Sequence, residues 1–171
     1  HTLELSSAAS DVYKRQALDR GVKVLMAHAG SAGSNLDQAG EEHSNFSLFM
    51  KMMDDPRYRA NLFGDISAVT QFNRLPGPLV GLLERTDIHH RLVNGSEYPL
   101  PAINIQIITR LRASYGLITE EQRRYLNEIY RDNPLLFDFV TKRILRHPTK
   151  GNGFPASVFM VNENLEGPAQ R

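Results

Sequence analysis

Three stretches decide the fold: "GVKVLMAHAG" (residues 21–30), "NLFGDISAV" (residues 61–69) and "RLVNGSEYP" (residues 91–99). Each is an apolar run that favours a β-strand and is bounded by glycine or polar residues. Segments with apolar residues at helical spacing lie between and after them. The alternation of strand and helix predicts parallel βα units, and therefore an α/β fold. The near-continuous apolar character of the first run predicts a strand that is covered on both faces.

Helical periodicity predicts the buried faces of four helices. The expected inward residues are Phe46, Phe49, Met50 and Met53; Leu79, Val80, Leu82 and Leu83; Leu126, Ile129 and Tyr130; and Leu136, Phe139, Val140 and Ile144. Thr119 and Gln122 have the spacing of a capping box, and a further amphipathic helix should end near Gly116. Residues 31–44 are predicted to be a polar loop, and residues 147–171 a surface tail rich in glycine and proline.

The composition excludes several classes of function. The 171 residues include 20 Lys and Arg against 19 Asp and Glu, so the chain lacks the basic surface that nucleic acids require. Without cysteine, any metal would be held by His, Asp, Glu or Lys. No apolar run reaches the roughly 18 residues of a membrane span. We expect a small-molecule substrate, no nucleic-acid or membrane partner, and a cytoplasmic location, with a lost leader left open by a first residue that is not Met.

Each predicted strand carries a polar group at its carboxyl end, where the working residues of βα folds gather. The first strand ends at His28, the second carries Asp65, and the third ends at Glu97. Singly, each has an ordinary structural explanation: a half-buried histidine, a turn-capping aspartate or a loop carboxylate. Their equivalent places in three successive units favour a function. A histidine and a carboxylate at one mouth can bind a divalent cation, or act as a general base and its partner.

The remaining candidates are weaker. His43, in the loop after the first strand, and Tyr98, beside Glu97, are predicted to contact substrate together with Asp65. Arg74 follows the second strand and could receive a substrate carboxylate. His89 and His90 precede the third strand, at the opposite end of the unit, and are therefore expected to be structural.

Four stretches together resemble the last third of the amidohydrolase-superfamily metal-dependent hydrolases: "VLMAHAG", "NLFGDISA", "RLVNGSEYPLP" and "NPLLFDFVTKRIL". The closer resemblance is to the branch that includes aminocarboxymuconate-semialdehyde decarboxylase, and it covers about residues 17–146. It implies a partial TIM (β/α)8 barrel comprising strands 6 to 8 and the C-terminal helices. His28 would be a metal ligand or a catalytic residue, Asp65 would line the site, and Glu97 would bind metal and activate water. The implied cofactor is a divalent metal ion, with zinc the first choice.

Two features depart from the family pattern. Glu97 stands where the family has an aspartate, which moves the carboxylate outward by one methylene. The family's His-x-His pair and its fifth-strand histidine have no counterpart, and the strands that carry them would precede Ala17. Because a catalytic metal site typically has at least three protein ligands, we expect the isolated chain to be inactive and to bind metal weakly. A His-x-His strand in the upstream gene sequence would support the assignment.

The stretch "SSAASDVYKRQ" (residues 6–16) resembles, at every position, the translation of a transposase-based sequencing adapter. Residues 1–16 are therefore expected to be a non-native leader, disordered or arbitrarily helical, and Lys14 and Arg15 are given no role. The same boundary at Ala17 follows from the strands that the implied barrel lacks.

The leading interpretation is a fragment of a hydrolase that attacks an amide, ester or lactone with metal-activated water, or of a related non-oxidative decarboxylase. The alternative is a βα domain without catalytic metal that binds a small molecule or a protein. A third possibility is a partial barrel that forms a homo-oligomer to cover its open sheet edge. Side chains of His28 and Glu97 that point to a common mouth would favour the enzyme.

Overall fold

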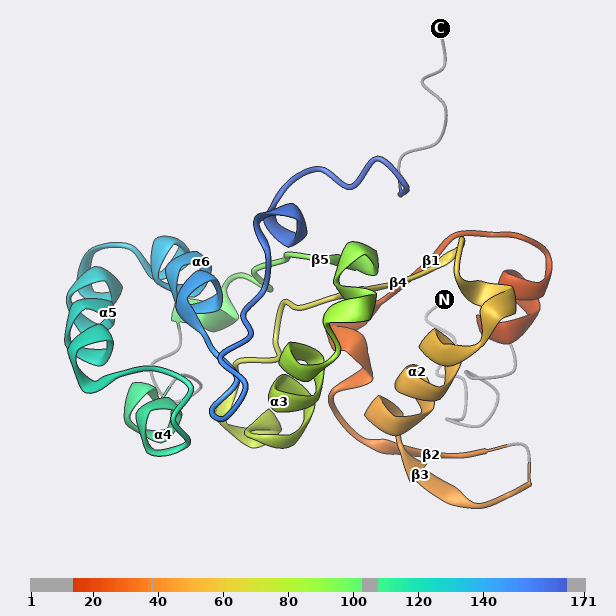
Figure 1. Ribbon diagram of the computed structural model, residues 1–171, viewed down its shortest axis with the longest axis horizontal. Helices are drawn as coiled ribbons and strands as arrows, with labels where there is room; N and C mark the ends of the chain where they lie inside the picture. Colours follow the sequence, from red (N-terminus) through yellow and green to blue (C-terminus); the bar gives the residue numbers. More distant parts are fainter. Residues whose placement is uncertain (1–13, 38, 103–107, 166–171) are drawn as a thin grey trace, which may run out of the picture. The chain divides into compact units, whose positions relative to one another are not determined.

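The computed structural model describes residues 14–37, 39–102 and 108–165. The chain is mixed α/β and contains a small parallel sheet. It divides into two compact units, the first comprising residues up to Asp65 and from Asn162 onward, and the second Ile66–Val161 (Figure 1). Within the described ranges, no helix is both long enough and apolar enough to cross a membrane.

The first unit contains a parallel strand pair. β1 (Val24–Met26) and β4 (Leu62–Asp65) pair with Val24 opposite Leu62. Helix α2 (Asn45–Asp54) lies between them in the sequence, so the unit contains a strand–helix–strand segment of the predicted kind. Two short 3-10 helices, at residues 27–30 and 56–58, flank these elements.

Strand β1 is not covered on both faces, which corrects the prediction. Its central residue, Leu25, is 46% exposed, and Val24 and Met26 are only half-buried. In β4, by contrast, Leu62 and Phe63 are buried. An apolar run identifies a strand, but its burial depends on what packs against each face, and the run does not specify that.

The segment predicted to be a polar loop, residues 31–44, contains an antiparallel hairpin instead. Its strands are β2 (Ser34–Leu36) and β3 (Glu42–Ser44) (Figure 1). In the turn, the Asp37 carboxylate accepts hydrogen bonds from two backbone N–H groups. Such bonds replace backbone–backbone bonds in tight turns. The hairpin was missed because its strands are only three residues long and mostly polar.

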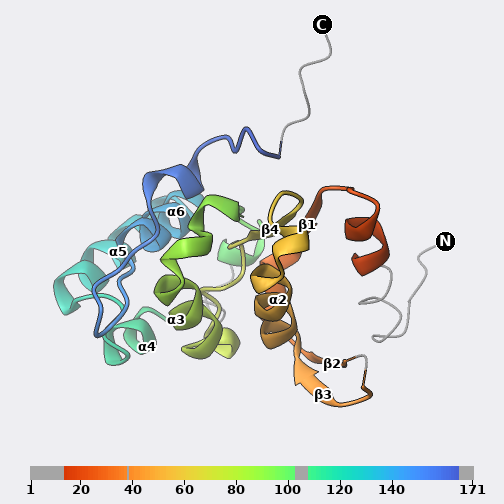
Figure 2. The ribbon, with the colours of Figure 1, turned by 45° about the vertical axis from the view of Figure 1, so that its right-hand side comes forward.

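The second unit is mainly helical. Its α-helices are α3 (Gly77–Glu84), α4 (Thr109–Ser114), α5 (Glu120–Asp132) and α6 (Pro134–Ile144). Strand β5 (Leu92–Val93) follows α3, and short 3-10 helices lie at residues 72–74, 86–91, 100–102 and 156–159. Helix α5 packs against both α4 and α6 (Figure 2).

Helices α3 and α5 agree well with the sequence-based expectations. In α3, the expected residues Leu79, Leu82 and Leu83 are buried. The fourth, Val80, is half-buried. The capping box of α5 is present: the Thr119 hydroxyl accepts from the Gln122 N–H, and the Gln122 side chain accepts from the Thr119 N–H. Of the apolar stripe expected on α5, only Leu126 is fully buried.

Helix α6 buries a different face from the one predicted. Leu136 and Phe139, expected to face inward, are 46% and 41% exposed. The buried residues are Phe137, Asp138, Thr141 and Lys142. Buried charged groups are costly unless they are paired, so this orientation requires a specific set of partners.

The termini differ in part from the expectations. Within the expected surface tail, Phe154 and Val158 are 3% and 1% exposed, so this segment contributes to the core of the second unit. The glycines and prolines of this segment correctly indicate an irregular backbone, but an irregular backbone can also be buried, and they do not indicate a surface position. The expected leader comprises residues 1–16. Residues 1–13 lie outside the described residues, and residues 14–16 begin a helical segment that extends to residue 19. The helix expected to end near Gly116 includes residues 103–107, which also lie outside the described part, and its described portion is α4.

Candidate functional site

His28 lies two residues after β1, in the 3-10 turn at residues 27–30. Its backbone N–H donates to Asp65 Oδ1 at 3.0 Å, and its ring Nδ1 lies 3.6 Å from the same oxygen. Asp65 is the last residue of β4, the strand that pairs with β1. Two of the predicted site residues therefore lie together in the first unit, because neighbouring parallel strands end at the same edge.

A cavity of about 350 Å³ adjoins His28 within the first unit. Strand β1 and the turn after it form one part of the lining, and α2 provides an apolar part. Asn35 and Asn45 add polar groups, and the Asn35 amide donates to Asn45 Oδ1 at 2.6 Å. Lys14, from the expected leader, also lines the cavity. Such a volume, with apolar walls and few polar groups, is typical of small-molecule sites.

Glu97 lies in the second unit, four residues after β5. Its carboxylate Oε2 accepts a hydrogen bond from Gln71 Nε2 at 3.3 Å. Gln71 was not predicted as a site residue. Gln71 lies in the irregular segment after β4. In the sequence, the feature that pointed to it was its position on the carboxyl side of a predicted strand.

The backbone at both predicted catalytic residues is strained. His28 has φ of 54° and Glu97 has φ of 53°, and within the described ranges only Ala29, with φ of 49°, joins them as a non-glycine residue of positive φ. L side chains rarely adopt this left-handed conformation. It costs about 1–3 kcal/mol per residue and persists only where the surroundings enforce it, which happens mostly at functional sites.

A buried ion pair holds the backbone just before Glu97. Lys142 Nζ donates to Asp138 Oδ2 at 2.6 Å and to the Gly95 carbonyl at 2.7 Å. Lys142 is 0% exposed and Asp138 is 3% exposed. Burial raises the pKa of Asp138, and the charges of Lys142 and Arg112 oppose that rise. The sequence contained the i, i+4 spacing of this pair, but such pairs usually lie on a solvated helix face.

A second buried cation lies close to this pair. The fully buried Arg112 donates from Nη2 to the Thr70 carbonyl at 2.6 Å, and burial lowers its pKa to about 10. A cavity of about 10 Å³, lined in part by Asp138, Gln71 and Ser96, lies in the same unit. It has room for about one water molecule. The core beneath the Glu97 segment is therefore polar.

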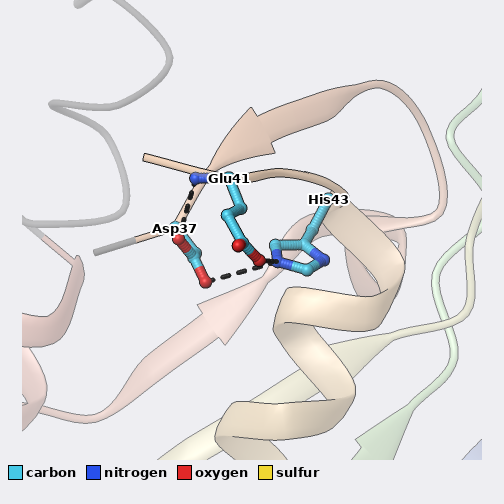
Figure 3. A group of neighbouring side chains, drawn as sticks. All are labelled: Asp37, Glu41 and His43. Carbon is cyan, nitrogen blue, oxygen red and sulfur yellow. Dashed lines mark hydrogen bonds and ion pairs between the residues drawn. The ribbon is translucent and has the colours of Figure 1, made fainter. Parts of the chain in front are cut away.

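His43 belongs to a different group of side chains, on the β2–β3 hairpin. Its Nε2 lies 3.3 Å from Asp37 Oδ2 and 3.9 Å from Glu41 Oε2 (Figure 3). Each of the three residues offers one possible ligand atom, and these atoms lie within 4.8 Å of one another. Backbone hydrogen bonds, chiefly from Glu41, lower the pKa of Asp37. His43 does not line the cavity beside His28, and exposed groups of this kind are common without a metal.

The other predicted residues occupy separate places in the second unit. Arg74 ends the 3-10 helix at residues 72–74 and is half-buried. Tyr98 is 62% exposed. His89 is buried, its Nε2 lies 2.8 Å from the Leu82 carbonyl, and burial lowers its pKa. These contacts agree with the structural role expected for His89.

The predicted site residues are of the types that bind divalent metals, but among the described residues the ligand atoms that come together in one group are those of Asp37, Glu41 and His43. A histidine nitrogen and carboxylate oxygens are the ligands that zinc and manganese take in a chain without cysteine. His28 and Asp65 belong to the first unit, and Glu97 belongs to the second unit. No family model, no curated protein and no solved structure matches this chain.

Proposed function

We propose that the chain is a fragment of a metal-dependent hydrolase of the amidohydrolase type, or of a related non-oxidative decarboxylase, and that it derives from a (β/α)8 barrel. The observation that carries the proposal is the left-handed backbone at His28 and Glu97. These two residues were selected from their positions after predicted strands. Backbone strain is independent of that criterion, and functional sites are where such strain concentrates.

The contacts of each residue suit its proposed role. Asp65 accepts the His28 N–H, and its Oδ1 lies 3.6 Å from Nδ1, so Asp65 holds the turn that carries the imidazole and faces one of its ring nitrogens. The imidazole is the proposed ligand or base of the first unit. The Glu97 carboxylate accepts a hydrogen bond from Gln71 and is the proposed metal-binding or proton-accepting group of the second unit.

A bound divalent ion would supply a water of lowered pKa as the nucleophile. His28 would act as a ligand or as an acid–base group in the first unit, Glu97 would have the same alternative roles in the second unit, and Asp65 would hold the turn that carries His28. The substrate would occupy the cavity beside His28, whose largely apolar lining suits a small organic molecule. In the decarboxylase, His28 would deliver a proton to the unsaturated carboxylate.

A binding module without catalytic metal is the second candidate. The specific observation in its favour is the 350 Å³ cavity, which lies entirely within the first unit and has polar groups at Asn35 and Asn45. Such a module would bind its ligand without Glu97. The two candidates therefore differ in whether Glu97 contributes to binding.

Metal titration of the purified chain tests the proposal. We expect zinc to bind weakly, with a dissociation constant above about 10 μM, because the chain carries fewer than the usual protein ligands. The substitutions His28→Ala and Glu97→Gln should each abolish this binding, as followed by isothermal titration calorimetry. His43→Ala should leave it unchanged and serves as the control for the hairpin group.

Two results would count against the proposal. Weak binding that survives both His28→Ala and Glu97→Gln would assign the metal to other residues. Loss of binding in His43→Ala alone would assign it to the hairpin, and the hydrolase proposal would then have no metal ligands. Tight stoichiometric binding by the unmodified chain would contradict the expectation of an incomplete site.

A further inference from the structure

Helix α6 buries its charged face although an apolar one was available. Asp138, Thr141 and Lys142 are buried, whereas Leu135, Leu136 and Phe139 are each more than 40% exposed. A buried ion pair is usually no more stabilising than a well-packed apolar pair of similar size. Stability alone therefore does not account for this orientation.

The ion pair reaches beyond α6 through Lys142. Lys142 Nζ bonds to Asp138 within the helix and to the Gly95 carbonyl, which is 47 residues away in the sequence. Gly95 lies two residues before Glu97. A Cβ at Gly95 would lie 3.3 Å from the Ser67 side chain, so this backbone approaches its surroundings closely.

The backbone after Glu97 is also held in place. The Leu100 N–H donates to the Glu97 carbonyl at 3.0 Å, which closes a turn around the strained residue. Gln71 contacts the side chain of Glu97, and Lys142 contacts the backbone before it. The left-handed φ of Glu97 is therefore enforced from several sides, as strained residues require.

We propose that Lys142 and Asp138 are positioning residues for Glu97: Asp138 orients the Lys142 ammonium, and Lys142 holds the Gly95 carbonyl so that the segment presents Glu97 in its left-handed conformation. The inference rests on the proposed function in one respect: Glu97, the residue that is positioned, is there proposed to bind metal or transfer a proton. Lys142 bonds to Asp138 and to the Gly95 carbonyl, so the pair would act through the backbone of the Glu97 segment and not on the substrate.

The test compares an apolar replacement of the pair with a matched control on the same helix. In Lys142→Met combined with Asp138→Leu, both charges of the pair are removed together, while the buried Arg112 keeps its hydrogen bond to the Thr70 carbonyl and loses the nearby Asp138 charge. The control is Thr141→Val, a near-isosteric change at a buried neighbour whose hydroxyl has no hydrogen-bond partner within the described part of the chain. Backbone NMR of the full chain measures φ of Glu97 from its HN–Hα coupling and intraresidue NOE.

We expect the unmodified chain and Thr141→Val to show a positive φ at Glu97, and the double variant to lose it while the rest of its spectrum stays folded. A folded double variant that keeps the positive φ would overturn the inference. A second variant, Asp138→Asn, covers the case in which the double variant does not fold. Amide exchange at Leu100 should become at least about tenfold faster in Asp138→Asn and stay unchanged in Thr141→Val. Unchanged exchange in both variants would also overturn the inference.

The same samples separate this inference from the proposed function. The NMR measurements contain no metal, so their outcome does not depend on whether Glu97 is a ligand. Mn²⁺ added to the unmodified chain should then broaden the signals of His28 and Glu97. If φ responds to the double substitution but Mn²⁺ broadens neither signal, the positioning holds and the proposed function fails. If Mn²⁺ broadens Glu97 equally in the unmodified chain and in the folded double variant, the positioning fails and the proposed function holds.

Discussion

Helices α2 and α6 are nearly equal in length, 10 and 11 residues, but α2 buries apolar side chains alone, whereas α6 also buries a pair of charged side chains. The buried residues of α2 are all apolar, namely Leu48, Phe49, Met52 and Met53. The buried residues of α6 are Phe137, Asp138, Thr141 and Lys142. Both helices begin at a polar N-cap, and both carry apolar residues at helical spacing.

The difference shows that periodicity identifies a helix more reliably than it identifies the face that the helix buries. For α2, two of the expected residues, Phe49 and Met53, are buried, and the hydrophobic effect explains the orientation. For α6, the buried face is the one that carries the Lys142 ammonium, which donates to the Gly95 carbonyl.

The largest effect is expected from breaking the α6 pair on one side only. Lys142→Met leaves the Asp138 carboxylate buried without its closest cation, which should cost about 3–5 kcal/mol of unfolding free energy. The double variant with Asp138→Leu should recover most of that loss. Urea denaturation followed by circular dichroism measures both. Equal losses of unfolding free energy in the single and double variants would contradict the view that the pairing of the two charges stabilises this orientation of α6.

A somewhat smaller effect is expected from the apolar face of α2. Met53 is 1% exposed, and Met53→Ala should destabilise the chain by about 2–5 kcal/mol through lost burial and the cavity that remains. The matched control is Met50→Ala on the same helix, because Met50 is only half-buried. Similar losses for the two variants in urea denaturation would contradict the observed face of α2.

The helix caps should affect both helices alike, because a cap acts locally and does not depend on which face is buried. The Ser44 hydroxyl accepts from the Ser47 N–H in α2, and the Asn133 side chain accepts from the Leu136 N–H in α6. Ser44→Ala and Asn133→Ala should each cost about 1 kcal/mol. Thermal and urea unfolding should show equal shifts, and a much larger loss for one cap would mean that it holds more than its own helix.

The smallest effect is expected on the exposed face of α6. Leu136 is 46% exposed, so Leu136→Ala should change the unfolding free energy by no more than about 0.5 kcal/mol. The same urea titration checks this value. A loss as large as that of Met53→Ala would mean that this face is covered in solution, as in the homo-oligomer considered from the sequence, and light scattering would then test for assembly.

Local signals predicted the elements whose causes are local. The capping box at Thr119 depends on residues three apart, and the leucines of α3 follow a simple helical spacing, so both could be recognised without the fold. The candidate site was predicted in part for the same reason. His28, Asp65 and Glu97 follow apolar runs, and parallel strands place such residues at one edge, as the contact between His28 and Asp65 illustrates.

By itself, the sequence determined where β1, β4, β5 and most helices lie, that the chain contains no cysteine, and which residues follow these three strands. Tertiary structure decided that Leu25 is exposed, that α6 turns Asp138 and Lys142 inward, and that Phe154 is buried. It also decided the left-handed backbone of His28 and Glu97. The physical reason is that each of these features depends on partners distant in the sequence, such as the Gly95 carbonyl for Lys142, and a local pattern carries no information about such partners.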